Sequence, residues 1–396
     1  MLPRSGIRPA LLAAAALNVV MALTMASVLA LPVMAPAIAA DTGLAPTLLG
    51  VYSFLMWTAG MAGSSFAGGL IARFGAVRVV QGALALCAVA LAGGAAGWTP
   101  ALALVPPLVG VGCALETPAS SDLLARVTPP AHRAFIFSLK QTGVQIGGMV
   151  AGVAYPAVLP VLGWRGAMVA LAALLVAWAL ALEPLRRRFD SPAHAPRPPA
   201  GGSGRLALVW GNRGLRDLAT ASLVYHAMQI CLNTFLVAFL VGEHGYSLAA
   251  AGLALAVAQL GGFVGRLGFW LLVGPRLPVM RLLVVIGFGM TAAALATGLA
   301  AGMLPPLAFG LLCFLFGLTA SGWNGVFLAE IARQSPPGEI ARVTGGVMVL
   351  SYAGLILGPL AFGAAAAAAT MGAGYVLLAA GTLVGTLALR GARAPA

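Results

Sequence analysis

A succession of long apolar stretches constrains this chain more than any other feature of its sequence. Twelve stretches of 17–29 residues are almost free of charge, and short polar or arginine-containing segments separate them. They cover residues 10–38, 47–72, 77–97, 101–125, 134–160, 165–183, 217–242, 248–273, 279–301, 305–331, 343–369 and 374–390. A helix rises about 1.5 Å per residue, so about 20 apolar residues cross the roughly 30 Å hydrocarbon core of a bilayer. With 61% hydrophobic and 8% charged residues, the chain is predicted to be an all-α membrane protein with twelve transmembrane helices.

The longest segment without an apolar stretch lies in the middle of the chain, from Glu183 to Arg216. It contains seven Arg, five Pro and a Gly-Gly-Ser-Gly run. Proline and glycine oppose a regular helix and arginine does not enter lipid, so residues 184–216 are predicted to form a solvated linker without regular helix. Six spans precede the linker and six follow it. The sequence therefore predicts two six-helix bundles, residues 1–183 and 217–396, related by duplication.

Positive charges mark one side of the predicted bundles. Apart from Arg165, and from Lys140 and Arg266 inside spans, the 22 Lys and Arg residues lie before span 1, beyond the even-numbered spans or in the linker. Loops rich in Lys and Arg stay in the cytoplasm, so this side, with both termini, is predicted to be cytoplasmic. We expect a multi-pass protein of a bacterial cytoplasmic (inner) membrane.

Short repeats support the duplication. Residues 123–130, LLARVTPP, match residues 330–337, EIARQSPP, at an offset of 207, and the same offset carries Gly110 onto Gly317. Gly147-Gly148 with Gly152 similarly parallels Gly358-Pro359 with Gly363. Two equivalent halves of this kind predict a site between them near the middle of the bilayer.

The sequence argues against an enzyme, a metalloprotein and a nucleic-acid-binding protein. No GxxxxGK[ST] run is present to bind ATP phosphates, and no cofactor is expected. Cys87, Cys113, Cys231 and Cys313 each stand alone inside an apolar stretch, without metal-ligand spacing. The net charge of +13 comes from arginines at the ends of spans instead of on one basic face, so nucleic acid is not an expected partner.

The loop after the second span resembles a known transporter signature. Its residues are Gly68-Gly69-Leu70-Ile71-Ala72-Arg73-Phe74-Gly75-Ala76-Val77-Arg78. They resemble the GxLaDRxGRR signature of the major facilitator superfamily of secondary transporters, and the resemblance covers the whole chain. It implies two pseudo-symmetric six-helix bundles that transport by alternating access. It also implies a gating role for Gly69, Arg73, Gly75 and Arg78.

The chain departs from the family pattern at three places. Ala72 stands where the family usually has an Asp that pairs across the cytoplasmic gate. Pro106 lies near the place of an arginine typical of drug-efflux members, and Gly147-Gly148 replaces the Gly-Pro of the antiporter signature. These differences argue against a proton/drug antiporter.

Glu116 and Lys140 are ionisable residues inside neighbouring antiparallel spans. Counted from Arg126 and Arg133, they lie roughly 15 Å and 10 Å deep. A charge in hydrocarbon is costly unless it has a partner or faces a cavity, so both are candidate substrate-site residues. A purely structural ion pair between spans 4 and 5 is the alternative.

Arg266 lies roughly 12 Å deep in the eighth span. Its guanidinium suits a carboxylate because two parallel N–H groups meet both oxygens. Gly265-Arg266-Leu267 also shows weak similarity to the oxalate and monocarboxylate branches of the superfamily, where an arginine at a similar place engages the substrate carboxylate. The alternative is an arginine that reaches the interface or bonds to carbonyls at a helix end.

Span 7 carries a polar stripe. His226, Gln229 and Asn233 are spaced by three and four residues, which places them on one helical face. Such a face either contacts substrate or proton, or bonds to neighbouring helices. Four further candidates have the same two interpretations, Asn18 and Asn324 as polar contacts and Tyr52 and Trp323 as aromatic walls.

Together these residues predict a monomeric secondary transporter. Cations inside the spans outnumber the single deep acid, which favours a small organic anion, such as a monocarboxylate, moved together with protons. Export of amphipathic drug-like compounds is the alternative.

Overall fold

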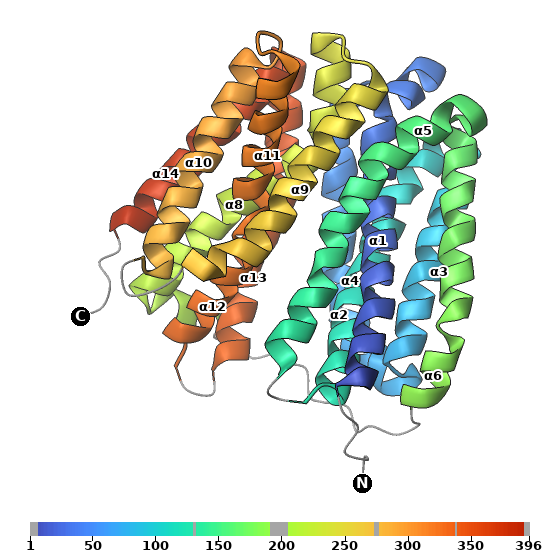
Figure 1. Ribbon diagram of the computed structural model, residues 1–396, viewed down its shortest axis with the longest axis vertical. Coiled ribbons are helices and arrows are strands. Elements are labelled where there is room, and N and C mark those ends of the chain that lie inside the picture. Colours follow the sequence, from blue (N-terminus) through green and yellow to red (C-terminus); the bar gives the residue numbers. More distant parts are fainter. Residues whose placement is uncertain (1–6, 130–131, 191–204, 273–276, 337–338, 392–396) are drawn as a thin grey trace. The chain divides into compact units, whose positions relative to one another are not determined.

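The computed structural model describes residues 7–129, 132–190, 205–272, 277–336 and 339–391, and every regular element in these ranges is helical (Figure 1). The first half contains α1 (Arg8–Thr42), the 3-10 helix η1 (Pro46–Leu48), α2 (Leu49–Phe74), α3 (Ala76–Gly94), α4 (Thr99–Val127), α5 (Arg133–Ala181) and α6 (Glu183–Phe189). The second half contains α7 (Arg205–Trp210), α8 (Arg213–His244), α9 (Leu248–Leu272), α10 (Val279–Ala300), α11 (Pro306–Gly322), α12 (Asn324–Gln334), α13 (Ile340–Ala368) and α14 (Met371–Gly391).

Eleven helices of the described residues are long and apolar enough to cross a membrane. One of them, residues 135–189, is 55 residues long and contains two of the predicted spans. Its helix breaks at Gly163, where φ is 65° and ψ is 174°, and Figure 1 shows α5 turning back on itself. A positive φ is costly for residues other than glycine, so Gly163 permits this turn. Eleven helices thus hold the twelve predicted spans.

The chain divides into two compact units. Unit 1 consists of residues 1–43 and 55–199, and unit 2 of residues 44–54 and 200–396. The division at 199/200 falls inside the predicted linker. The start of α2 belongs to unit 2, where the Ser53 hydroxyl lies 3.3 Å from that of Thr234.

The prediction of a linker without regular helix is wrong at both of its ends, because α6 and α7 form there. In α6, Pro184 occupies a first-turn position that needs no N–H donor, and Arg186 pairs with Glu183 one turn earlier. Residues 191–204, which hold most of the prolines and glycines, lie outside the described residues.

Equivalent glycines bring equivalent helices together in the two units. A Cβ on Gly110 of α4 would collide with the backbone of Met56 in α2. A Cβ on Gly317 of α11 would collide in the same way with Ala258 in α9. Likewise, Gly147 of α5 packs on α1, and Gly358 of α13 packs on α8. The sequence repeats thus correspond to repeated helix contacts, as small residues permit in membranes.

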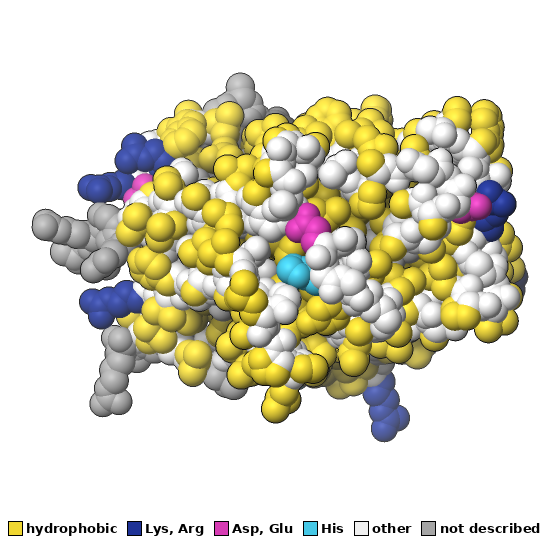
Figure 2. Space-filling model, turned by 90° about the horizontal axis from the view of Figure 1, so that it is seen from above, with side chains coloured by type: hydrophobic (Ala, Val, Ile, Leu, Met, Phe, Trp, Pro, Cys, Tyr) yellow, Lys and Arg dark blue, Asp and Glu magenta, His cyan; other side chains and the backbone are white. Residues whose placement is uncertain are grey.

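Few charges lie on the face shown in Figure 2, where hydrophobic side chains, together with uncharged other side chains and backbone, cover most of the surface. In unit 1, Asp41 near the end of α1 and Arg165 just after the break in α5 form an exposed pair, with Oδ2 and Nη2 2.9 Å apart. Opposite charges that are half exposed in this way contribute little stability.

Candidate substrate site

A polar cluster in unit 2 surrounds the break between α11 and α12. The helix is interrupted at Trp323, and the nearby Ser321 carbonyl accepts hydrogen bonds from side chains. Arg266 donates through Nε at 3.2 Å, and Asn324 donates through Nδ2 at 3.3 Å. Asn324 Nδ2 also lies 3.3 Å from Gln229 Oε1. Helices α8, α9 and α12 thus direct three predicted site residues to one place.

His226 lies next to this group. Its Nδ1 is 2.9 Å from the Ser222 carbonyl, which orients the ring, and its ring centroid is 4.7 Å from that of Trp323. Trp323 is fully buried and donates to the Ala320 carbonyl at 3.0 Å. The buried Trp323 ring therefore packs edge-to-face against the His226 imidazole. His226, Gln229, Arg266 and Asn324 are each half-buried, and we call these four the C-terminal cluster.

Arg266 has no acidic partner within the described part of the chain. No described carboxylate lies within 4.0 Å of its guanidinium, and its one hydrogen bond there goes to the Ser321 carbonyl. Ser321 is the second-last residue of α11, so the predicted alternative, a bond to a helix-end carbonyl, is present for one donor. Within the described residues, the two terminal amino groups of Arg266 make no hydrogen bond.

Two further predicted site residues, Asn233 and Tyr52, belong to unit 2. The Asn233 side-chain oxygen Oδ1 accepts from Gln259 Nε2 at 3.0 Å, and both side chains are buried between α8 and α9. Tyr52 is buried at the start of α2. The polar stripe of span 7 therefore has two different surroundings, with Asn233 serving a helix contact.

In unit 1, Glu116 and Lys140 form the predicted pair. Lys140 Nζ lies 3.4 Å from Glu116 Oε1, and the two side chains are 1% and 2% exposed. Lys140 also donates to the Ser120 hydroxyl, and Thr117 donates to Glu116 Oε2 at 3.0 Å. A buried ion pair needs such additional hydrogen bonds to offset its lost hydration.

Asn18 serves the backbone next to this pair. Its Nδ2 donates to the Leu139 carbonyl at 2.8 Å and lies 3.0 Å from the Thr142 hydroxyl. The side chain thereby links α1 to the turn of α5 that carries Lys140. In this structure Asn18 positions Lys140, and its amide group is engaged within unit 1.

Some residues of these sites were not predicted. Ser120 lies one turn after Glu116, a spacing that places both on one face of α4 and that could have identified it. Ser321 contributes only its carbonyl, so its side chain gives no signal. Gly322 and Gly325, which flank the break, were the available hint.

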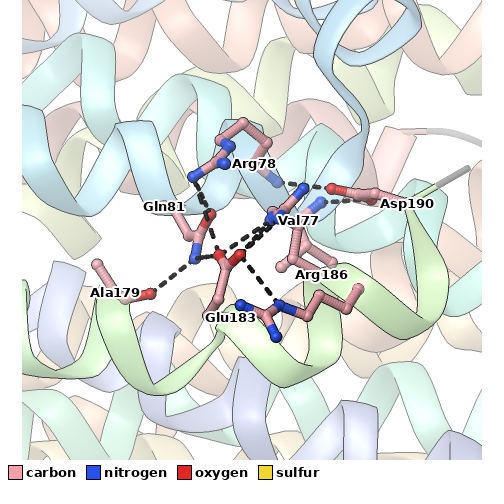
Figure 3. Close-up of polar contacts among 8 residues, drawn as sticks. Val77, Arg78, Gln81, Ala179, Glu183, Arg186 and Asp190 are labelled. Atoms are coloured by element: carbon pink, nitrogen blue, oxygen red, sulfur yellow. Dashed lines mark hydrogen bonds and ion pairs between the residues drawn. The ribbon is translucent and has the colours of Figure 1, made fainter. Parts of the chain in front are cut away.

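The four predicted gating residues lie along the last turns of α2, in the turn that follows and at the start of α3, and Figure 3 shows Arg78 with its contacts. Gly69 has open space around it, and Arg73 stacks on Phe74 with 5.0 Å to the ring centroid. Gly75 adopts φ 87°, and Arg78 Nη1 donates to Gln81 Oε1 at 3.1 Å.

An acid that the sequence did not reveal holds this turn. Asp190 accepts from the backbone N–H groups of Val77 at 3.0 Å and Arg78 at 2.9 Å (Figure 3). Its carboxylate therefore caps the first turn of α3, where anions are stabilised. Ala72 has no carboxylate to make such contacts. Asp190, which is more than a hundred residues later in the sequence, provides a carboxylate at this turn.

The signature sequence and the duplicated helix contacts point to one family. Residues 16–359 match the family described as Major Facilitator Superfamily. The chain belongs to this superfamily. It is therefore a multi-pass membrane transporter and not an enzyme.

Individual relatives agree with this assignment. The chain is 26% identical over 325 residues to the "Putative niacin/nicotinamide transporter NiaP" of Bacillus subtilis (strain 168), covering 78% of this chain and 77% of the relative. It is 34% identical over 152 residues to the "Putative metabolite transport protein" of Haemophilus influenzae (strain ATCC 51907 / DSM 11121 / KW20 / Rd), which is 37% of each protein. The match thus spans about a third of that relative's length.

The fold is also shared with solved transporters. A bacterial homologue of the human lysosomal transporter Spinster superposes with a TM-score of 0.72 at 17% identity, covering 98% of this chain and 96% of that one. At this identity the likeness establishes the fold alone.

Proposed function

We propose that this protein is a secondary transporter that moves a small organic anion, a monocarboxylate, across the cytoplasmic membrane by alternating access. The observation that carries the proposal is Arg266, a half-buried guanidinium in a membrane-spanning helix, with no described carboxylate within 4.0 Å. Burying an arginine in hydrocarbon costs free energy unless it has a partner, so we infer that an anionic substrate is the partner of Arg266.

The geometry of the C-terminal cluster supports a carboxylate. The Ser321 carbonyl fixes Nε at 3.2 Å and thereby orients the planar guanidinium. Its two terminal amino groups can then bind both oxygens of one carboxylate. Gln229 and Asn324 supply further polar groups, and the His226 imidazole lies beside them.

The named relative from Bacillus subtilis adds a substrate of this class. Niacin carries one carboxylate on an aromatic ring, whereas nicotinamide is its neutral amide. An aromatic monocarboxylate is therefore a suitable first probe for this chain, with the carboxylate on Arg266 and the ring beside His226.

Coupling to protons is the second part of the proposal. Glu116 is the acid buried among the spans of unit 1, and its charge is balanced by Lys140 at 3.4 Å. Protonation of Glu116 would leave Lys140 as an uncompensated charge. A proton on Glu116 would therefore change the electrostatic energy of Lys140, and a change of this kind could couple proton movement to transport.

The remaining assignments follow from charge and family. Arginine-rich loops favour the cytoplasm for both termini and the linker. We place the protein as a monomer in a bacterial inner membrane.

Transport of matched ligands into proteoliposomes tests the proposal. Labelled nicotinate and nicotinamide differ in charge but hardly in shape, so wild-type protein should take up nicotinate preferentially. Arg266→Ala should abolish the preference, whereas Arg281→Ala, which removes an exposed arginine of α10, should retain it. Full nicotinate uptake by Arg266→Ala, or a preference for lipophilic cations, would favour export of drug-like compounds instead.

A further inference from the structure

A second basic site lies in unit 1, at the ends of α2 and α6. Asp190 sits directly on Gly75, where an added Cβ would lie 2.5 Å from its carboxyl carbon. The residues that precede this contact on the two segments are Arg73-Phe74 and Arg188-Phe189. Each arginine lies over its own phenylalanine ring, at 5.0 Å and 5.3 Å from the centroid. We call these four residues the arginine–phenylalanine patch.

The acids near this patch are already occupied. Both oxygens of Asp190 accept backbone N–H groups of α3. Glu183 accepts from Arg186 Nε at 2.8 Å and 2.9 Å (Figure 3). No carboxylate in the described ranges lies within 4.0 Å of Arg73 or Arg188. Arg187, which precedes Arg188, is 76% exposed and pairs with Glu183 at 3.6 Å. Arg73 and Arg188 therefore carry the positive charge of this surface that has no described carboxylate within 4.0 Å.

The patch also has an apolar component at the end of a membrane span. Phe74 is the last residue of α2 and is 48% exposed. Aromatic and arginine side chains at such an end lie at the level of lipid headgroups, with the ring toward the acyl chains and the charge toward water. A soluble anion would contact only the guanidinium groups, whereas a lipid would contact both the guanidinium groups and the exposed Phe74 ring.

We propose that the arginine–phenylalanine patch binds the headgroup phosphate of an anionic phospholipid in the adjoining leaflet. Arg73 and Arg188 would hold the phosphate, because guanidinium groups match its oxygens in pairs. Phe74 would lie against the first acyl carbons. The N-terminus of α3 is not the anion site, since Asp190 already caps it.

Lipid binding to the purified full-length protein tests this site. Phosphatidylglycerol, phosphatidylcholine and inorganic phosphate are titrated separately, and bound lipid is counted by native mass spectrometry. Each arginine near an anionic lipid contributes roughly fivefold to affinity, so Arg73→Gln/Arg188→Gln should bind phosphatidylglycerol about 25-fold more weakly. Arg213→Gln/Arg281→Gln removes the same charge elsewhere and should bind it as wild type does.

Two further measurements distinguish a loss of lipid binding from a folding defect. Arg73→Lys/Arg188→Lys keeps the charges but loses the paired N–H donors, so it should bind phosphatidylglycerol more weakly than wild type and more tightly than the Gln double variant. The preference of wild type for phosphatidylglycerol should weaken in about 0.5 M salt. Equal binding by wild type and the Gln double variant would overturn the proposal, as would an equal loss in the control variant. If inorganic phosphate binds as tightly as phosphatidylglycerol, the patch is a site for a soluble anion and the proposal is wrong. If phosphatidylcholine binds as tightly as phosphatidylglycerol, charge plays no role and the proposal is also wrong.

Discussion

Lys140 Nζ lies 3.4 Å from Glu116 Oε1 between α5 and α4, and almost nothing of either side chain is exposed. Two opposite charges in such surroundings depend on each other, because the loss of one leaves the other buried without compensation. The same is not true of Asp41 and Arg165, which are about half exposed to their surroundings.

This difference gives the first prediction. Glu116→Gln or Lys140→Met alone should lower the free energy of unfolding by about 3–5 kcal/mol, and the double variant should recover much of the loss. The matched control is Asp41→Asn, Arg165→Met and their double variant, which should each change it by less than about 1 kcal/mol. Thermal or denaturant unfolding in detergent measures both cycles. Strictly additive losses for Glu116 and Lys140 would show that the pair does not interact.

The second prediction separates the two interpretations of Arg266. If its planar donor fork holds the substrate, Arg266→Lys should weaken nicotinate binding at least about tenfold although the charge is kept. A helix-end contact to Ser321 alone would be served almost as well by lysine. Equilibrium binding at matched protein concentration distinguishes these outcomes, and wild-type affinity in Arg266→Lys would contradict the fork.

The third prediction concerns the close approach of α11 to α9. Gly317→Ala places a methyl group against the Ala258 backbone and should destabilise unit 2 by about 1–3 kcal/mol. Gly310 lies in the same helix with open space around it, so Gly310→Ala should stabilise the helix by up to about 1 kcal/mol. A comparison of melting temperatures tests both signs. Equal effects would show that helix propensity, and not packing, governs both positions.

The fourth prediction concerns the cap of α3. Asp190→Ala removes both acceptors for the Val77 and Arg78 amides and should cost about 0.5–2 kcal/mol. Hydrogen exchange of the first turn of α3 should accelerate in this variant. Asp122→Ala breaks only the pair with Arg126 in α4 and is the control. Unchanged exchange at Val77 and Arg78 would mean that the cap contributes nothing.

The fifth prediction tests sidedness. In a background without the four native cysteines, Arg187→Cys and Met303→Cys should react with a membrane-impermeant maleimide from opposite sides of the membrane. Both positions are well exposed, at 76% and 83%. We expect Met303→Cys to label in intact cells and Arg187→Cys only after the membrane is opened. Labelling of both in intact cells would contradict the proposed topology.

The spans and the correspondence between the two halves could be predicted from the sequence alone. Because a helix must be long and apolar to cross lipid, each span is visible in its own stretch of sequence. Gly110 and Gly317 share the offset of the internal repeat, and they make equivalent helix contacts in the two units. The pairing of Glu116 with Lys140 was also predictable, because depth along two adjacent antiparallel spans follows from residue counts. The ion pair between Glu330 and Arg333, 2.5 Å apart in the structure, was predictable from their spacing of three residues.

The partners of the polar side chains could not be predicted before the fold was known. Arg266 and Asn324 converge on the Ser321 carbonyl, Asn18 bonds to the Leu139 carbonyl, and Asp190 caps α3 from more than a hundred residues away. Each of these partners is a backbone group, which every residue possesses and which no sequence pattern marks. Whether such a group is available depends on where a helix breaks or begins and on which helix packs beside it, and that is settled only when the whole bundle has folded.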